Sequence, residues 1–418
     1  MSGAPSTDPA GHAAAAERDA VGPAFDRLWA ALEPVGTDPT GGYRRLAYAP
    51  PELELRAWFA AEARARSLDV HEDRAGNLWA WWGDPTAGDA LVTGSHLDSV
   101  RRGGAFDGPL GVVSGLLAVD VLRARGVVPS RPVAVAAFAD EEGARFGVAC
   151  AGSRLLTGQL DPAHALALTD DDGVTYAAAL RASGRDPADL GPDAEVVPSI
   201  GTYVELHVEQ GRALDGLGAA VGVASAIRAH GRWRFDLAGR PDHAGTTRLE
   251  DRDDPMLAHA RTILAAREAA TAHGGLATVG RVQIEPNGVN AIPARVRTWL
   301  DARADEEASV RAIVADVAAA AGVGPVEESW TPRTDLDAAL RDRLAARLGG
   351  APVLATGAGH DAGILALAGI PTAMLFVRNP TGVSHAPEEH AGRDDCLTGV
   401  VALADVLADL LDDAAGVR

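Results

Sequence analysis

The feature that most constrains the fold of this chain is the stretch 91–113, which reads LVTGSHLDSVRRGGAFDGPLGVV. An apolar run leads into a loop that carries His96, Asp98 and Asp107, and an apolar pattern with helical spacing follows. An apolar run that ends in polar residues before a helix is typical of a buried strand whose carboxyl end meets a ligand. The stretch therefore predicts a metal site at the end of a strand.

The same order of strand and helix recurs along the chain. Strand-like runs at 90–93, 132–139 and 203–208 are separated by helix-like segments, of which 110–125 is the clearest. The same patterns predict further helices at 24–32, 51–67 and 397–411 and further strands at 69–71, 77–82 and 371–377. This alternation is typical of an α/β fold with a parallel sheet, in which ligands bind beyond the carboxyl ends of the strands.

From about residue 223 the pattern changes to that of a separate insert. Residues 232–237 alternate like a strand with one exposed face, and helix-like or strand-like segments follow at 255–272, 277–284, 296–302 and 306–321. A chain of 418 residues also exceeds the size at which one core keeps growing. We therefore predict a flexible segment at 1–24, a main domain at 25–222 and 331–418, and an inserted domain at 223–330.

The composition excludes several classes of function. The 58 acidic and 38 basic side chains give a formal charge of -20, which repels nucleic acid and anionic membrane surfaces. No apolar stretch reaches the ~18 residues that a membrane span needs, and residues 1–24 lack the basic start and continuous apolar segment expected of a secretory signal. The only cysteines, Cys150 and Cys396, are too few for a disulfide framework or a thiolate metal site. We expect a soluble cytoplasmic protein whose metals are held by histidine and carboxylate.

Six residues at or near the ends of apolar runs are candidates for this chemistry: His96, Asp107, Glu141, Glu142, His207 and His385. Each taken alone is better explained as a solvated loop residue or a helix cap, because a metal site needs several converging groups. Imidazole and carboxylate together suit Zn²⁺, Mn²⁺ or Co²⁺, and two such ions ~3.5–4 Å apart can share one carboxylate. The six positions together therefore favour a metal centre.

Within this set the sequence suggests separate roles. Asp107 follows a glycine-rich approach and suits the shared position, and Asp98 is two residues from His96 and could accept its second ring proton. The adjacent Glu141 and Glu142 point in different directions if the strand geometry persists, so one can bind metal while the other acts as a general base. The alternative is an exposed acidic turn.

Nine segments resemble, in order, the motifs of one family. They are GSHLDSV (94–100), GGAFDGPLGV (103–112), DEEGARFG (140–147), GSRLLTG (152–158), YVELHVEQG (203–211), HAGTT (243–247), PNGVNAIP (286–293), GAGHDA (357–362) and GVSHAPEE (382–389). Together they resemble the amidohydrolase branch of the aminoacylase and carboxypeptidase metallopeptidases. That branch includes allantoate amidohydrolase, N-carbamoyl-L-amino-acid hydrolase and β-ureidopropionase, and the resemblance runs from about residue 25 to the end of the chain.

The resemblance implies a mixed sheet with helices on both faces and an inserted α+β lid that forms a homodimer. It implies two divalent ions (Zn²⁺, Mn²⁺, Co²⁺ or Ni²⁺) and assigns the ligands and the general base. One ion would be held by His96, Asp107 and His207, and the second by Asp107, Glu142 and His385, with Glu141 as the base.

The resemblance also implies a set of residues that face the substrate: Gln210, His243, Asn290, Arg303, Gly359 and His360. His243 would polarise the scissile carbonyl, in its own subunit or in the partner subunit, and Arg303 would grip a carboxylate. Because every basic residue except histidine is an arginine, a surface ion pair is the alternative for Arg303. Pro241 and Arg248 depart from the family pattern and leave the substrate open.

The function implied is hydrolysis of the terminal C–N bond of a ureido or N-carbamoyl carboxylate, with release of ammonia and carbon dioxide. The substrate would be a small molecule such as allantoate or an N-carbamoyl-L-amino acid. The alternatives are an N-formyl-amino-acid deformylase, an aminopeptidase or dipeptidase, and a binding protein without catalysis. A binding protein would have lost a ligand or the base, whereas all six positions are filled.

Overall fold

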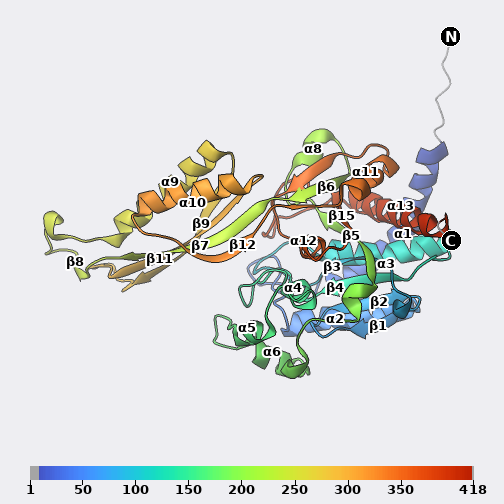
Figure 1. The fold of residues 1–418 in the computed structure, drawn as a ribbon, viewed down its shortest axis with the longest axis horizontal. Helices are drawn as coiled ribbons and strands as arrows, with labels where there is room; N and C mark the ends of the chain where they lie inside the picture. Colours follow the sequence, from blue (N-terminus) through green and yellow to red (C-terminus); the bar gives the residue numbers. More distant parts are fainter. Residues whose placement is uncertain (1–8, 417–418) are drawn as a thin grey trace, which may run out of the picture. The chain divides into compact units, whose positions relative to one another are not determined.

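The computed structural model describes residues 9–416 and divides the chain into two compact units. Unit 1 consists of Met1–Ser225 and Asp335–Arg418, and unit 2 of Ala226–Thr334. In Figure 1, unit 2 is coloured from yellow-green to orange, and along the chain it comes after one segment of unit 1 and before the other. The chain therefore leaves unit 1 once, forms unit 2 and returns.

Unit 1 contains a nine-stranded mixed sheet whose central strands run parallel. The order is β1 (Asp69–Glu72), β2 (Leu78–Trp82), β4 (Val133–Phe138), β3 (Ala90–His96), β5 (Ile200–Val208), β15 (Thr372–Val377), β6 (Val221–Ile227) and β13 (Thr334–Asp335), and β14 (Val353–Thr356) pairs with β6. β3 is parallel to β4 and β5, and β5 to β15, whereas β2 and β6 pair antiparallel with β4 and β15. The carboxyl ends of β3, β4, β5 and β15 therefore meet at one edge.

Both faces of this sheet are buried. In β4, Val133 and Val135 belong to one apolar core, and Ala134 and Phe138 belong to the other. Because successive side chains of a strand point to opposite faces, the two cores lie on opposite sides of the sheet. This explains why the sequence of these strands is apolar throughout and not alternating.

Helices supply the other half of each core (Figure 1). One core includes residues of α1 (Pro9–Leu32), α2 (Pro50–Ala65), α3 (Pro109–Ala124), α11 (Ala338–Arg347) and α13 (Arg393–Gly416). The other includes residues of α4 (Ala151–Leu156), α5 (Pro162–Ala167), α6 (Tyr176–Ala182), α7 (Val196–Ser199), α8 (Ala213–Leu217) and α12 (Asp361–Leu367). Within residues 9–416, no helix has the length and apolar character that crossing a bilayer requires. The predicted fold class, a mixed sheet with helices on both faces, is confirmed.

The start of the chain differs from the prediction of a flexible segment at 1–24. Residues 9–24 form the first part of α1, and residues 1–8 lie outside the described residues. The helix contains many alanines, which favour helical backbone. Val21, Phe25 and Leu28 recur at helical spacing and are buried in the core of unit 1. Packing of this apolar face therefore holds a segment whose composition suggested disorder.

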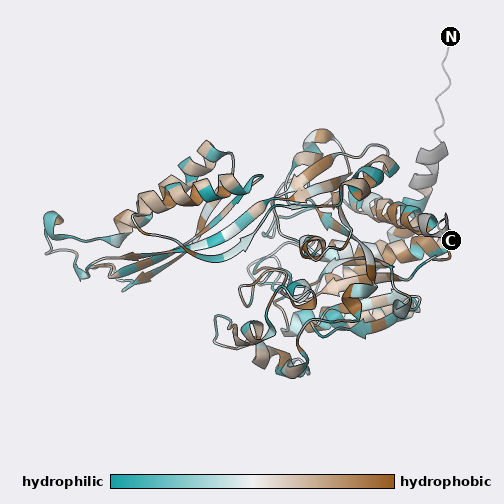
Figure 2. Cartoon of the chain, in the orientation of Figure 1, coloured by the Kyte–Doolittle hydropathy of each residue, from teal (hydrophilic) through white to brown (hydrophobic). Residues whose placement is uncertain are grey.

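Unit 2 is an antiparallel sheet with two helices. Its strands lie in the order β12 (Val326–Thr331), β7 (Ala229–Ala238), β11 (Arg295–Ala304) and β9 (Leu276–Glu285), and α9 (Pro255–His273) and α10 (Glu307–Ala321) pack on it around their own core. Hydrophilic and hydrophobic residues alternate along the long strands (Figure 2), and in β11 every second residue is buried. A separate pair of short strands, β8 (Asp242–His243) and β10 (Ala291–Ile292), also belongs to this unit.

Candidate metal centre

The six candidate residues gather at the edge where the central parallel strands of unit 1 end. They are His96 at the end of β3, Asp107 before α3, Glu141 and Glu142 after β4, His207 near the end of β5, and His385 after β15. Most of these side chains are buried, and only His385 is half exposed. The carboxyl ends of parallel strands thus bring together residues that are far apart in the sequence.

The carboxylate of Asp107 lies at the centre of this group. Its Oδ1 is 3.4 Å from His96 Nε2 and 3.2 Å from His207 Nε2. Its Oδ2 is 3.4 Å from His385 Nε2 and accepts a hydrogen bond of 2.9 Å from Gln210 Nε2. The two oxygens therefore face two different sets of nitrogen atoms, as expected of a carboxylate that two cations share.

The hydrogen bonds of the two buried imidazoles show which ring nitrogen carries the proton and which one faces Asp107 with a lone pair. His96 Nδ1 lies 3.1 Å from the carbonyl oxygen of Asp98, and His207 Nδ1 lies 2.9 Å from that of Val208. A carbonyl only accepts, so each neutral ring carries its proton on Nδ1 and a lone pair on Nε2. Neither Nε2 atom has a hydrogen-bond partner within the described part of the chain. Lone pairs aimed at a carboxylate oxygen repel it unless a cation lies between them, so these residues fit a metal ion.

A second group of metal-binding atoms adjoins the first. Glu142 Oε2 lies 3.4 Å from His385 Nε2, which also faces Asp107. The potential ligand atoms of His96, Asp107 and His207 lie within 4.8 Å of one another, and so do those of Asp107, Glu142 and His385. The structure thus brings together both sets that the family resemblance implies, with Asp107 in common.

The carboxylates of Asp107, Glu141 and Glu142 give the candidate metal site an electrostatic environment that stabilises positive charge. Burial alone would lower the pKa of His96, but the negative charge of Glu141 and the neighbouring carboxylate of Asp107 raise it well above its usual value. Burial also opposes protonation of His385, yet Asp107 and Glu142 raise its pKa to about 9. Since metal ions and protons compete for the same nitrogen lone pairs, a site that attracts protons this strongly also attracts divalent cations.

Glu141 lies beside the first set of ligand atoms. Its Oε2 is 3.7 Å from His96 Nε2, and Cys150 Sγ donates a hydrogen bond of 3.4 Å to its Oε1. The side chain is buried, and burial is the main reason that the pKa of Glu141 stands well above its usual value. A buried carboxylate with only a weak donor and a position next to a candidate metal ligand can take up a proton during a reaction.

Asp98 supports the site differently from the prediction. Its carboxylate lies 3.6 Å from His96 Nδ1, beyond a hydrogen bond, and the backbone carbonyl of Asp98 binds the ring instead. The carboxylate accepts hydrogen bonds from the backbone N–H groups of Glu141 (3.2 Å) and Glu142 (3.1 Å). Short acidic side chains commonly bind backbone N–H groups in turns. Asp98 therefore orients His96 through its main chain and the turn after β4 through its side chain.

Two backbone conformations explain how the loops carry these side chains. Gly108 has a φ of 86°, and a Cβ atom there would lie 2.5 Å from Cε1 and Nδ1 of His96. Only glycine accommodates both the conformation and the ring. His385 has a φ of 56°, which is unfavourable for a residue with a side chain and is typical of functional sites.

Three residues predicted to face the substrate adjoin this group in unit 1. Gln210 donates to Asp107, as described above. The His360 ring packs against that of His207, with their centroids 4.5 Å apart, and Gly359 precedes His360 directly before α12. The structure therefore places Gln210 and His360 beside the candidate metal ligands, and Gly359 is the chain neighbour of His360.

Sequence reasoning missed buried acidic residues that support this region. Glu205 accepts hydrogen bonds from Ser95 Oγ (3.0 Å) and from the backbone of Ala362 (3.1 Å), and Asp361 accepts one from Ser153 Oγ (2.5 Å). Both acidic side chains are fully buried. They hold the first residues of α12. The motifs YVELHVEQG and GAGHDA contain these residues, but the sequence suggested roles only for their neighbours His207, Gln210, Gly359 and His360.

His243 and Asn290 lie together in unit 2. His243 pairs with Ala291 in the short β8–β10 ladder, and the backbone of Ala244 donates to the carbonyl of Asn290 at 3.0 Å. Both predicted side chains are exposed. The backbone of Gly245 donates to His243 Nδ1 at 3.0 Å, so a neutral ring carries its proton on Nε2. His243 therefore presents an N–H donor to a ligand.

Arg303, also in unit 2, takes part in an ion pair along its own strand. Its Nε and Nη2 bind the two oxygens of Asp301 at 2.7 and 3.0 Å. This is the forked geometry that arginine uses with carboxylates. Asp301 thus occupies one edge of the guanidinium, and the grip of Arg303 on a substrate carboxylate stays a prediction.

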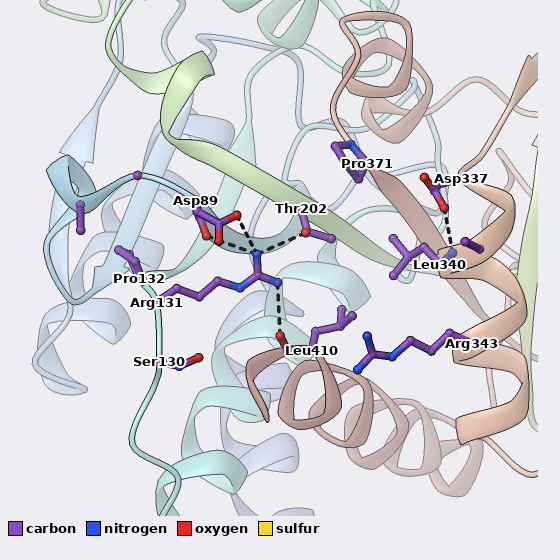
Figure 3. Close-up of a pocket in the computed structure, with 13 residues that line it drawn as sticks. Asp89, Ser130, Arg131, Pro132, Thr202, Asp337, Leu340, Arg343, Pro371 and Leu410 are labelled. Carbon is purple, nitrogen blue, oxygen red and sulfur yellow. Dashed lines mark hydrogen bonds and ion pairs between the residues drawn. The ribbon is translucent and has the colours of Figure 1, made fainter. Parts of the chain in front are cut away.

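A cavity of about 650 Å³ lies at the opposite edge of the unit 1 sheet and contains none of the candidate residues (Figure 3). Arg131 crosses it and binds Asp89 Oδ1 (3.1 Å), Thr202 Oγ1 (3.4 Å) and the carbonyl of Leu410 (3.3 Å). Neighbouring oxygens therefore already bind both terminal nitrogens of this arginine. Because ligands of parallel sheets bind at the carboxyl ends of the strands, we place the functional site at the other edge.

Comparison with known proteins agrees with the geometry. Residues 92–409 match the family described as Peptidase family M20/M25/M40. An N-carbamoyl-L-amino acid amidohydrolase of Geobacillus stearothermophilus is 38% identical over 398 residues, which cover 90% of this chain and 96% of that protein. An allantoate amidohydrolase of Escherichia coli (strain K12) is 32% identical over 397 residues, which cover 91% and 95%.

Solved structures give the same result. AtUAH in complex with (S)-hydroxyglycine is similar with a TM-score of 0.85 and 27% identity, covering 94% of this chain and 98% of that one. An amidase of the hydantoinase/carbamoylase family from Burkholderia vietnamiensis has a TM-score of 0.82 and 29% identity, covering 92% and 97%. The chain therefore belongs to the peptidase family M20/M25/M40.

Proposed function

We propose that the protein is a metal-dependent amidohydrolase that adds water to the terminal C–N bond of a ureido or N-carbamoyl carboxylate and releases ammonia and carbon dioxide. The observation that carries this proposal is the convergence of two sets of metal-binding atoms on Asp107, beside the buried Glu141. Relatives that cover nearly the whole chain are named for N-carbamoyl-L-amino acids and for allantoate, which belong to this substrate class.

We infer that the site takes two divalent ions. His96, Asp107 and His207 would hold one ion, and Asp107, Glu142 and His385 the other. Imidazole and carboxylate ligands suit Zn²⁺, Mn²⁺, Co²⁺ and Ni²⁺. Ions held by these residues would polarise a carbonyl group and would lower the pKa of water toward neutrality.

The residues of the chain divide the remaining work. Glu141 accepts a proton from the attacking water and delivers it to the terminal nitrogen, which leaves as ammonia when its C–N bond breaks. The carbamate that remains loses carbon dioxide when its other C–N bond breaks, and its nitrogen takes up a proton. His243 donates its Nε2 proton in a hydrogen bond to the carbonyl oxygen as negative charge develops there, in its own or the partner subunit. Further substrate contacts are assigned to Gln210, Asn290, Arg303, Gly359 and His360.

Product formation across a panel of compounds tests this function. The metal-loaded protein should release ammonia from allantoate, an N-carbamoyl-L-amino acid or β-ureidopropionate, with a kcat/KM at least about tenfold above that for dipeptides. Formate from N-formyl-L-glutamate without ammonia from any ureido compound would instead identify a deformylase. Hydrolysis of dipeptides alone would identify a peptidase, and ligand binding without any product would identify a binding protein.

We infer that unit 2 acts as a lid and joins two copies of the chain in a homodimer. On α9, Leu257 and Leu264 are 62% and 65% exposed, and their spacing places them on the same side of the helix. The adjacent β9 is an edge strand of the sheet and exposes Leu276. Exposed apolar side chains beside an open strand edge are typical of a surface that meets a second copy.

The double substitution Leu257→Glu and Leu264→Glu should convert the dimer to a monomer, because two carboxylates would lose water in the interface without a partner. Sedimentation velocity gives the mass. Val128→Glu is the matched control, since Val128 is 87% exposed in unit 1 and its replacement should leave the mass unchanged. A wild-type monomer, or a double variant that stays dimeric, would exclude this surface.

The cytoplasm is the proposed location. Cys150 and Cys396 are both free thiols, which suits a reducing compartment.

A further inference from the structure

Glu389 is a buried carboxylate to which no role has been assigned so far, although it lies against the shared ligand Asp107. Its side chain is only 5% exposed. Its Oε1 accepts hydrogen bonds from the backbone N–H groups of Phe106 (2.9 Å) and Asp107 (3.0 Å). Glu389 follows His385 in the segment after β15, so these bonds join two loops that are far apart in the sequence.

A serine adds a second connection between the same loops. Ser384 Oγ lies 3.4 Å from Asp107 Oδ2 and 3.5 Å from Glu389 Oε2. Ser384 precedes His385, whose left-handed backbone was described above. The segment 384–389 thus carries a candidate ligand at one end and, at the other, the carboxylate that binds the Asp107 backbone.

The loop before Asp107 is shaped to receive this carboxylate. A Cβ atom at Gly104 would lie 2.3 Å from Glu389 Oε1 and 2.4 Å from its Cδ, so only a residue without a side chain allows the close approach. In the same loop, the ring of Phe106 stacks on the ring of Trp29, with their centroids 4.9 Å apart. It also meets the ring of His390 edge-on, with centroids 5.9 Å apart. Apolar packing and the Glu389 hydrogen bonds therefore hold the loop at neighbouring points.

We propose that Glu389 is a positioning residue. It holds the carboxylate of Asp107 between the ring nitrogens that face it, and it fixes the position of the loop that carries His385 relative to Asp107. The inference rests on the proposed function, because it assumes that metal ions bind these residues. Glu389 belongs to neither set of metal-binding atoms within the described residues. Its effect on the metals therefore passes through the backbone of Asp107 and the loop of His385.

Three variants test this inference in the full-length protein. Glu389→Ala removes both hydrogen bonds to the loop and should weaken Co²⁺ binding by at least about tenfold, as is usual when a residue that orients a ligand is lost. Glu389→Gln keeps an oxygen that can accept the same two bonds and an N–H₂ group that can reach Ser384, so it should stay within about threefold of wild type. Glu388→Ala is the matched control, because this exposed neighbour carries the same charge.

Binding is measured by competition with a chromogenic chelator, and the Co²⁺ absorption spectrum reports the ligand geometry. If Glu389→Gln keeps the Co²⁺ affinity that Glu389→Ala loses, the loss comes from the missing hydrogen bonds and not from a general loss of stability. Unchanged affinity in Glu389→Ala would overturn the proposal. Equal loss in the Ala and Gln variants would also overturn it, since the negative charge would then be the property that matters.

A further variant keeps the test decisive if Glu389→Ala fails to fold. Gly104→Ala introduces the Cβ atom that displaces the Glu389 carboxylate, and it should weaken Co²⁺ binding in the same direction. Wild-type affinity in this variant would count against the proposal. A wild-type protein that binds no Co²⁺ would overturn the proposed function itself, which is a different outcome from equal binding by wild type and variants.

Discussion

Glu141→Gln leaves both metal positions filled but lowers kcat by about 10²–10⁴-fold, the usual contribution of a positioned general base. The amide has the shape of the carboxylate but cannot take a proton from water and pass it to the leaving nitrogen. The side chain lies 3.7 Å from His96 Nε2 and outside the two sets of metal-binding atoms, so ion binding should persist. Steady-state ammonia release and elemental analysis on the same sample measure the two effects.

The adjacent carboxylate provides the contrast for this experiment. Glu142→Gln alters a proposed ligand, since Glu142 Oε2 faces His385 Nε2 at 3.4 Å, and it should lose metal as well as activity. A metal-loaded Glu141→Gln variant with nearly normal turnover would remove Glu141 from the mechanism. Loss of metal in both variants would make Glu141 a ligand.

Asp107→Ala empties the site or leaves at most one ion per chain, and turnover disappears with it. The substitution removes the oxygen that faces His96 and His207 and also the oxygen that faces His385. No other candidate ligand is common to the two sets that the resemblance implies. Elemental analysis after dialysis against a metal buffer gives the number of ions per chain.

A surface aspartate supplies the control for this variant. Asp171 is 74% exposed and pairs with Arg101, so Asp171→Ala should keep the metal content of wild type. Full occupancy of both positions in Asp107→Ala would show that Asp107 is not shared between two ions. The two candidate sets would then be independent of each other.

The sequence predicted the central strands and long helices because their apolar patterns are strong. The apolar runs at 132–139 and 203–208 correspond to β4 and β5, and the amphipathic pattern at 255–272 to α9. It did not predict β12, in which most residues are exposed, so no alternation marks it. It also missed α12, which is short and is held by Glu205 and Asp361. Elements that depend on tertiary contacts leave little local signal.

In the candidate site too, some residues could be predicted from the sequence and others depend on contacts between distant parts of the chain. Its six main residues could be found because several histidine and acidic residues recur together at the ends of apolar runs, and the structure brings all six together. The contacts of Asp98 and Glu389 could not be found, since both act on backbone N–H groups of another loop. A residue type does not reveal which distant backbone it will meet.

On the proposed function, the Nε2 atoms of His96 and His207 also couple metal supply to the survival of the folded chain. Folding removes water from these nitrogens without giving them a protein partner within the described residues, which costs free energy. Ions that bind only the folded chain offset this cost, by about 1.4 kcal/mol for each tenfold excess over Kd. The fraction of unfolded chains exposed to proteases falls accordingly. A cell short of the right metal would therefore lose the protein as well as its activity.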